Sequence, residues 1–135
     1  MILSIDYGEK KVGLALSDET ELVGSALPTL KIKTPANAIE LIREICGEKH
    51  VSKIVVGVPS GWQNIDSPQT KIVREFIAFL KVSIKLPVDE WDESYSTKIA
   101  ERNISGKQKK NSDSYAAMVI LQEYLDYLRN EKNHI

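Results

Sequence analysis

An aspartate lies near the start of the chain, where the sequence pattern predicts the end of a strand. Alternation over residues 2–7 places Ile2, Ser4 and Asp6 on one face of that strand, and Gly8 follows it closely. An aspartate in this position is either a metal ligand or a turn residue whose carboxylate accepts hydrogen bonds from nearby amides. The residues around Asp6 leave both interpretations open.

Four acidic residues lie within five positions later in the chain, with no basic residue among them. They are Asp89, Glu90, Asp92 and Glu93. Like charges this close repel one another, and a divalent cation would relieve the repulsion, although a solvated strand end is the alternative. Alternation along a strand places Asp89, Trp91 and Glu93 on one face and the other two acids on the opposite face. At most two of the four acids can therefore reach one site.

A third candidate, Asp113, precedes the core-facing residues of the last predicted helix. It comes three and four positions before Ala116 and Ala117, so it projects from the core-facing side of the first helical turn. The helix dipole favours an anion there by about 0.3–1 kcal/mol. Asp113 is either a metal ligand or the helix N-cap, a role for which Ser112 competes.

Three carboxylates on separate elements are typical of a site for Mg²⁺ or Mn²⁺. Such ions prefer carboxylates, water and substrate phosphate as ligands. Two of them about 4 Å apart could activate a water molecule and stabilise the leaving oxygen of a phosphodiester. The single cysteine, Cys46, excludes an internal disulfide, and the two separated histidines, His50 and His134, form no zinc motif.

The elements that must position these acids follow from the hydrophobic pattern. Extended segments at residues 2–7, 12–17 and 21–31 are joined by short turns, which predicts an antiparallel meander. Apolar residues then recur at helical spacing after Thr34-Pro35 and again after Ser67-Pro68, both of which are helix-start signals. The pattern also predicts a strand buried on both faces at 53–58, a strand at 86–91, a short helix at about 97–104 and a last helix at about 113–130.

The predicted order is three strands, then helix, strand, helix, strand and helix. An antiparallel meander that feeds right-handed βαβ crossovers gives an α/β fold, with one mixed five-stranded sheet and helices packed against it. That is the RNase H-like architecture. A length of 135 residues suits a single domain over residues 1–135.

The composition predicts a soluble domain with a buried core, since 42% of the residues are hydrophobic and 27% are charged. The start of the chain lacks the features of a signal peptide, and no apolar stretch approaches about 18 residues. We therefore expect a cytoplasmic protein that does not span a membrane. The net charge is −1, so contact with nucleic acid must come from a local basic patch.

Two groups of lysines flank the predicted ligands. Lys10 and Lys11 follow Asp6, and Lys107, Lys109 and Lys110 precede Asp113. These side chains could hold the nucleic-acid backbone on either side of the scissile phosphate without reading its sequence. The alternative is that they are simply solvated.

Five segments of the chain together resemble a known family. They are residues 5–13 (IDYGEKKVG), 55–59 (VVGVP), 67–76 (SPQTKIVREF), 86–97 (around WDE) and 113–125 (starting with DSYAA). The matches run in order from Ile2 to about Asp126 and resemble the YqgF/RuvX family of pre-16S rRNA nucleases, also described as Holliday junction resolvases.

The resemblance implies catalytic and metal-binding roles for Asp6, Glu93 and Asp113, and so it selects Glu93 from the acidic cluster. It also implies a Mg²⁺-dependent phosphodiester hydrolase that processes the 5′ end of pre-16S rRNA in ribosome biogenesis. The chain departs from the family at Ser94, where an arginine is usual. That arginine could hold substrate phosphate or orient Glu93, so its loss puts rate and substrate preference in question.

Other functions stay open on the sequence. A Holliday junction resolvase acting on branched DNA requires two symmetric cuts and hence a two-fold dimer, whereas trimming of precursor rRNA or cleavage of single-stranded DNA needs only a monomer. We expect a monomer or a weak homodimer. A non-catalytic nucleic-acid-binding module is a second alternative. A nucleotide-binding fragment of the actin and sugar-kinase type is a third, but those proteins need two such domains around the nucleotide.

Overall fold

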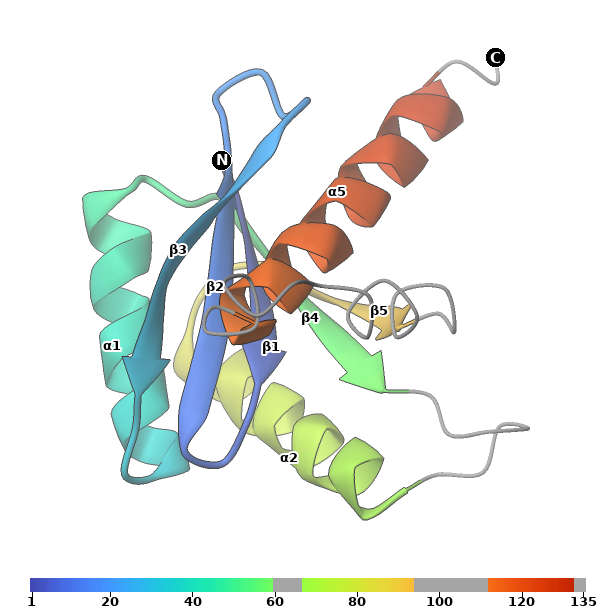
Figure 1. Ribbon diagram of the computed structural model, residues 1–135. Helices are drawn as coiled ribbons and strands as arrows, with labels where there is room; N and C mark the ends of the chain where they lie inside the picture. The colour runs from blue at the N-terminus through green and yellow to red at the C-terminus, as the bar shows by residue number, and fades with distance from the viewer. Residues whose placement is uncertain (60–66, 94–111, 133–135) are drawn as a thin grey trace.

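The computed structural model describes residues 1–59, 67–93 and 112–132, without the side chains at positions 112, 113 and 132. These residues form five strands and three helices (Figure 1). The strands are β1 (Ile2–Tyr7), β2 (Lys11–Ser17), β3 (Gly24–Lys31), β4 (Lys53–Pro59) and β5 (Val88–Glu93), and the helices are α1 (Pro35–Glu48), α2 (Pro68–Ser83) and α5 (Ser112–Lys132).

The strands form one sheet in the order β3-β2-β1-β4-β5. Strand β1 is antiparallel to β2, and β2 is antiparallel to β3, as the short turns predict. Strand β4 lies parallel to β1 and to β5. Helix α1 carries the chain from β3 to β4, and helix α2 carries it from β4 to β5, which is the kind of crossover that parallel strands need. The predicted mixed five-stranded sheet is confirmed.

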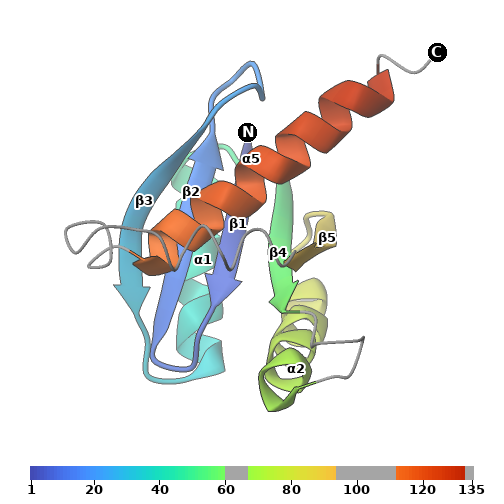
Figure 2. The ribbon, with the colours of Figure 1, turned by 45° about the vertical axis from the view of Figure 1, so that its right-hand side comes forward.

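The helices cover both faces of the sheet (Figures 1 and 2). Helices α1 and α2 pack on one face, over a core of branched aliphatic residues that includes Ile5, Ile42 and Val56. Helix α5 crosses the other face obliquely over a smaller cluster, which includes Ala117 and Leu121. Strand β4 therefore has packed layers on both sides, and its residues 54–58 are all buried, as the continuous apolar run predicts.

Local signals begin α1 and α2 where the sequence predicts. The hydroxyl of Thr34 accepts a hydrogen bond from the Asn37 amide at 3.0 Å, and Ser67 accepts one from the Thr70 amide at 3.2 Å. A proline follows each cap, at a position where a helix needs no amide donor. Each cap contributes about 1 kcal/mol to helix stability.

Strand β5 lies two residues later than the predicted range of 86–91. The amide of Ile54 donates to the carbonyl of Pro87 at 2.9 Å, and the parallel pairing then runs from Ile54–Val88 to Pro59–Glu93. Pairing with β4 thus extends β5 through the acidic residues. The apolar pattern alone predicts an earlier end to this strand. As a result, Glu93 is the last residue of a regular strand.

Strand β3 begins at Gly24, whereas the predicted segment begins at residue 21. The preceding turn is organised by Asp18, whose carboxylate accepts hydrogen bonds from the amides of Leu22 and Val23 and from the Thr20 hydroxyl. Glu21 adopts a left-handed backbone with φ 59°. This turn replaces the first three residues of the predicted strand. The short helix predicted at 97–104 lies outside the described residues.

Helix α5 is fixed to the sheet by polar and apolar contacts along its length. The hydroxyl of Ser4 on β1 donates to the Ala117 carbonyl, and Thr29 on β3 shares a 2.7 Å hydrogen bond with Ser114. Further along, the Trp91 indole on β5 donates to Glu123 at 3.1 Å. The helix begins at Ser112, close to the predicted start. None of the three described helices is long and apolar enough to cross a membrane.

Candidate active site

Asp6 lies near the carboxyl end of β1, on the face of the sheet that α5 covers. Ser4, two residues earlier on the same face, bonds to α5 through the Ala117 carbonyl. Asp6 is paired with Gly13 of β2, which adds no side chain beside the carboxylate. Asp6 is only partly buried. The predicted position of this acid at a strand end therefore agrees with the structure.

Glu93 reaches the same face from the carboxyl end of β5. The two residues that alternate with it, Asp89 and Trp91, bond to Tyr124 and Glu123 of α5. Glu93 Oε1 lies only 3.1 Å from the position that a Cβ atom on Gly57 would occupy. The carboxylate of Glu93 thus turns back over β4, in the direction of β1.

Gly57 of β4 leaves room between the two acids. Its strand pairs with β1 up to Ile5–Val56, and one further step in this register places Gly57 beside Asp6. A Cβ atom there would also lie 2.3 Å from Ile120 Cδ1, so α5 and Glu93 approach the bare backbone together. Sequence patterns alone did not single out this residue. A glycine inside an otherwise apolar strand was the available signal, since it often marks a close approach.

The structure places the backbone of Asp113 in the first turn of α5. This turn precedes Ala117, which contacts β1, and Ser114 bonds to Thr29 of β3. The start of the helix is therefore held on the same face of the sheet as Asp6 and Glu93. The side chain of Asp113 lies outside the described residues, so its role as third ligand stays a prediction.

The other three acids of the cluster have separate surroundings. Asp89 accepts a hydrogen bond from the Tyr124 hydroxyl and pairs with Lys53 at 3.2 Å, and these two donors lower its pKa, with Tyr124 the larger cause. Glu90 and Asp92, which alternate onto the opposite face of β5, line a cavity of about 440 Å³ that Trp91 and Arg74 of α2 also border. The predicted alternation is confirmed, and Glu93 alone of the four turns toward Gly57.

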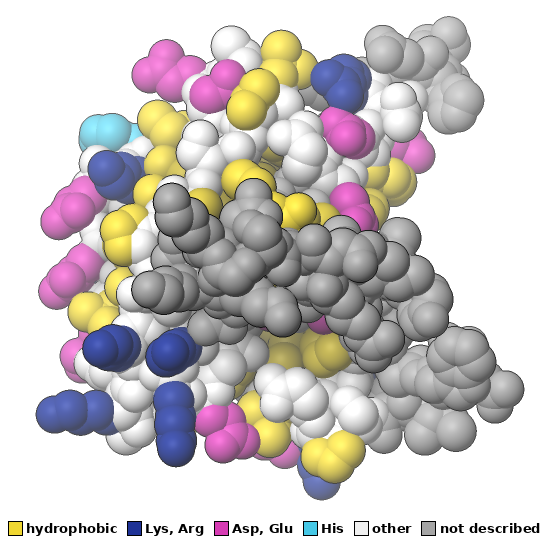
Figure 3. Space-filling view, in the orientation of Figure 1, with side chains coloured by type: hydrophobic (Ala, Val, Ile, Leu, Met, Phe, Trp, Pro, Cys, Tyr) yellow, Lys and Arg dark blue, Asp and Glu magenta, His cyan; other side chains and the backbone are white. Residues whose placement is uncertain are grey.

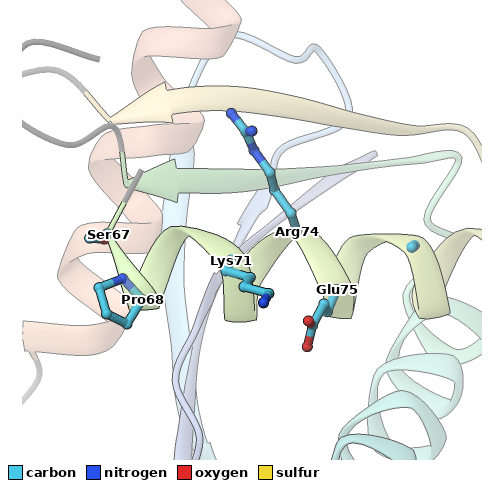
Figure 4. Close-up of a pocket in the computed structure, with 6 residues that line it drawn as sticks. Ser67, Pro68, Lys71, Arg74 and Glu75 are labelled. Carbon is cyan, nitrogen blue, oxygen red and sulfur yellow. The ribbon is translucent and has the colours of Figure 1, made fainter. Parts of the chain in front are cut away.

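Helix α2 starts directly beside the ends of β1 and β4. The Gln69 amide donates to the Tyr7 carbonyl at 3.3 Å, and the Thr70 hydroxyl donates to the Pro59 carbonyl. Arg74 extends from the helix toward β5, whereas Lys71 and Glu75 point away from the sheet (Figure 4). A surface hollow of about 540 Å³ runs along these residues, lined by Ser67, Pro68, Lys71, Arg74, Glu75 and Ala78.

The donors on this face suit an oxygen-binding ion such as Mg²⁺ or Mn²⁺. Asp6 and Glu93 offer carboxylates over a patch of backbone without side chains, and the described thiol, Cys46, packs in the core on the other face of the sheet. Burial raises the pKa of Cys46 to about 11, so its thiol stays protonated. Among residues 1–59, 67–93 and 114–131, no three His, Cys, Asp or Glu side chains form a metal-binding group. A complete ligand set therefore requires a residue such as Asp113.

The predicted nucleic-acid contacts are placed in part. Lys10 lies in the turn that follows β1, and Lys11 is the first residue of β2; both side chains are exposed. The Gly8 amide donates to the Lys11 carbonyl at 2.9 Å and closes this turn. The lysines predicted at 107, 109 and 110 lie outside the described residues.

The sheet order and the helix that crosses the sheet obliquely define an RNase H-like fold. RuvC of T. thermophilus in complex with a Holliday junction has this fold, with a TM-score of 0.60, 13% identity and coverage of 96% of each chain. The Holliday junction resolvase of fowlpox virus is also similar, with a TM-score of 0.52 and 16% identity over 93% of this chain and 98% of the viral one.

The chain belongs to the RuvX family, described as Holliday junction resolvase, whose model matches residues 1–127. A relative from Halothermothrix orenii, named "Putative pre-16S rRNA nuclease", is 36% identical over 93% of this chain and 94% of its own length. A relative from Syntrophus aciditrophicus with the same name is 37% identical, over 97% of this chain and 91% of its own length. The predicted family and nuclease class are thereby confirmed.

Proposed function

We propose that this chain is a metal-dependent nuclease that cleaves phosphodiester bonds at a site formed by Asp6, Glu93 and Asp113. One observation carries the proposal. Glu93 Oε1 lies 3.1 Å from the Cβ position of Gly57, over the bare backbone that the sheet register sets beside Asp6. Carboxylates brought together from two strands in this way repel each other, and a shared divalent cation offsets that repulsion.

The chain's own residues would prepare the site in three ways. Asp6 and Glu93 place carboxylates at the ends of β1 and β5, on either side of β4, and Asp113 adds a third carboxylate from the start of α5. Gly57 keeps the space between them open. When bound, Mg²⁺ or Mn²⁺ would supply Lewis-acid stabilisation of the charge that develops on the phosphate and leaving oxygens.

Precursor rRNA is the substrate that we favour, with processing of the 5′ end of pre-16S rRNA in the cytoplasm as the biological role. The names of the relatives from two organisms support it. The description of the family model supports a second candidate, resolution of Holliday junctions in DNA. The two substrates demand different assemblies, because paired symmetric cuts need a two-fold dimer and trimming does not.

Cleavage assays with matched variants test the proposal. The wild-type protein and Asp6→Asn are incubated with Mn²⁺ and with precursor rRNA, single-stranded DNA or a four-way junction. We expect cleavage of the precursor rRNA by the wild type and loss of that cleavage in Asp6→Asn. Asp92→Asn is the control, because this exposed acid lies on the opposite face of β5. Full cleavage by Asp6→Asn would contradict the metal site, and cleavage of the junction alone would favour the second candidate.

A further inference from the structure

Two lysines face each other across strands at one end of the sheet. Lys11 of β2 and Lys31 of β3 are direct partners in the antiparallel register. Such partners have Cβ atoms about 5 Å apart, and like charges placed directly opposite destabilise the strand pair. Lys10 precedes β2 and Lys33 follows β3, so the paired ends of these strands bring together four lysines from two separate segments.

This pair projects from the same face as the candidate site. Val12 follows Lys11 in β2, and Leu30 precedes Lys31 in β3. Both of these apolar side chains pack against the core under α1 and α2. Because successive side chains alternate, Lys11 and Lys31 project from the opposite face, which is the one that carries α5 and Asp6.

The register also fixes how far the lysines lie from Asp6. Asp6 pairs with Gly13, and Lys11 is two residues further along β2, with Lys31 on the next strand. With about 3.4 Å per residue and about 4.8 Å between strands, their Cα atoms lie roughly 8 and 12 Å from that of Asp6. These are spans of roughly two to four nucleotides at about 3.4 Å of rise per nucleotide.

The backbone holds the four lysines in place. The Ile32 amide donates to the Lys10 carbonyl at 3.0 Å, which ties the end of β3 to the turn after β1. A Cβ atom on Gly8 would lie 2.6 Å from the Lys11 carbonyl oxygen, so this close turn depends on glycine. Figure 3 shows Lys and Arg side chains gathered at this end of the molecule. All four lysines are exposed, and none forms an ion pair with another described residue.

We propose that Lys11 and Lys31, flanked by Lys10 and Lys33, bind the phosphodiester backbone of the substrate on the β3 side of the candidate site. A polyanion compensates the repulsion within the pair, which no described acidic partner does. The inference rests on the proposed nuclease function and extends it. It adds Lys31 and Lys33, which lie far from the acidic motifs in sequence, and it defines the strands across which the substrate approaches Asp6.

Salt-dependent binding tests this site. Binding of single-stranded RNA and of single-stranded DNA is measured between 50 and 300 mM salt with the cleavage-deficient Asp6→Asn protein as parent. The variant is Lys11→Gln/Lys31→Gln. Each lost phosphate contact lowers the slope of log K against log salt by about 0.7 for single strands, so we expect a decrease of about 1.4. If parent and variant bind equally at 1 M salt, a slope change of that size corresponds to about 25-fold weaker binding by the variant at 0.1 M salt.

Lys49→Gln/Lys85→Gln, in the same parent, is the matched control. It removes the same charge from exposed positions near the amino ends of β4 and β5, at the opposite end of the parallel strands. We expect it to keep the parental slope. Thermal unfolding supplies an independent readout, because relief of the repulsion should leave Lys11→Gln/Lys31→Gln at least as stable as its parent.

The outcomes separate the two proposals. An unchanged slope in Lys11→Gln/Lys31→Gln, or an equal decrease in the control, overturns the lysine site, even if the wild-type protein cleaves RNA. Cleavage that fails in the wild-type protein, together with the expected slope change, overturns the nuclease proposal but keeps the binding site. If the parent binds neither RNA nor DNA, the lysine site is wrong, and cleavage by the wild-type protein decides the nuclease proposal separately. A loss confined to RNA or to DNA contradicts recognition of the shared backbone.

Discussion

Replacement of Gly57 with alanine introduces a methyl group between the two described acids and α5. The new Cβ atom would lie 2.3 Å from Ile120 Cδ1 and 3.1 Å from both Ile120 Cγ1 and Glu93 Oε1. Ile120 is buried, so the side chain or the helix must shift to relieve the contact. Overpacking of this kind costs about 1–3 kcal/mol. We expect a loss of that size in the free energy of unfolding by urea, and weaker Mn²⁺-dependent cleavage because Glu93 is crowded.

The double variant Gly57→Ala/Ile120→Val separates the two effects. Valine lacks Cδ1, so the 2.3 Å contact disappears, while the 3.1 Å contact with Glu93 Oε1 remains. Ile120→Val alone should cost about 0.5–1.5 kcal/mol. We expect the double variant to be more stable than the sum of the single effects predicts, and cleavage to stay low. Additive stability losses, or wild-type stability in Gly57→Ala, would refute this packing of α5 and Glu93 against Gly57.

Two further predictions concern contacts that position α5. Ser4→Ala removes the hydrogen bond to the Ala117 carbonyl, and we expect a loss of about 0.5–1.5 kcal/mol in urea unfolding; an unchanged midpoint would contradict it. Tyr124→Phe removes the main donor that lowers the pKa of Asp89. A lowered pKa means that the ionised carboxylate stabilises the fold above its unfolded pKa of about 3.9, and that this stability is lost as pH falls through the folded pKa. Tyr124→Phe should therefore be less stable than the wild type at pH 7. The loss should be about 1 kcal/mol or less, because the Asp89 side chain is 51% exposed. The difference in stability between the two proteins should narrow toward pH 3. An equal difference at both pH values would exclude this role of the Asp89 charge.

Periodicity predicted the parts of the fold that depend on local signals. The buried strand β4 and the starts of α1 and α2 follow from apolar runs and from caps such as Thr34, which act within a few residues. The boundaries of β5 could not be predicted in this way, because they depend on pairing with β4. This pairing keeps Asp92 and Glu93 in a regular strand despite their polarity.

The candidate site shows the same division. Alternation limited the acidic cluster to Asp89 and Glu93 on one face but could not choose between them. The family resemblance selected Glu93, and the structure adds that Asp89 is engaged by Lys53 and Tyr124. Sequence patterns did not single out Lys31 as a candidate for nucleic-acid binding. Its position opposite Lys11 arises from the register of β2 and β3, which local patterns do not predict. Distances of this kind belong to the tertiary structure, so local patterns carry no signal for them.

Direct binding of Mn²⁺, followed by electron paramagnetic resonance, tests the metal site independently of any substrate. The wild-type protein should bind Mn²⁺, and Asp6→Asn, Glu93→Gln and Asp113→Asn should each weaken binding by about tenfold or more, since even changes around metal ligands cost about 10–100-fold. Asp92→Asn, next to Glu93 but on the opposite face, should bind as the wild type does. Equal binding in all four variants, or no binding by the wild type, would contradict a metal centre at these carboxylates.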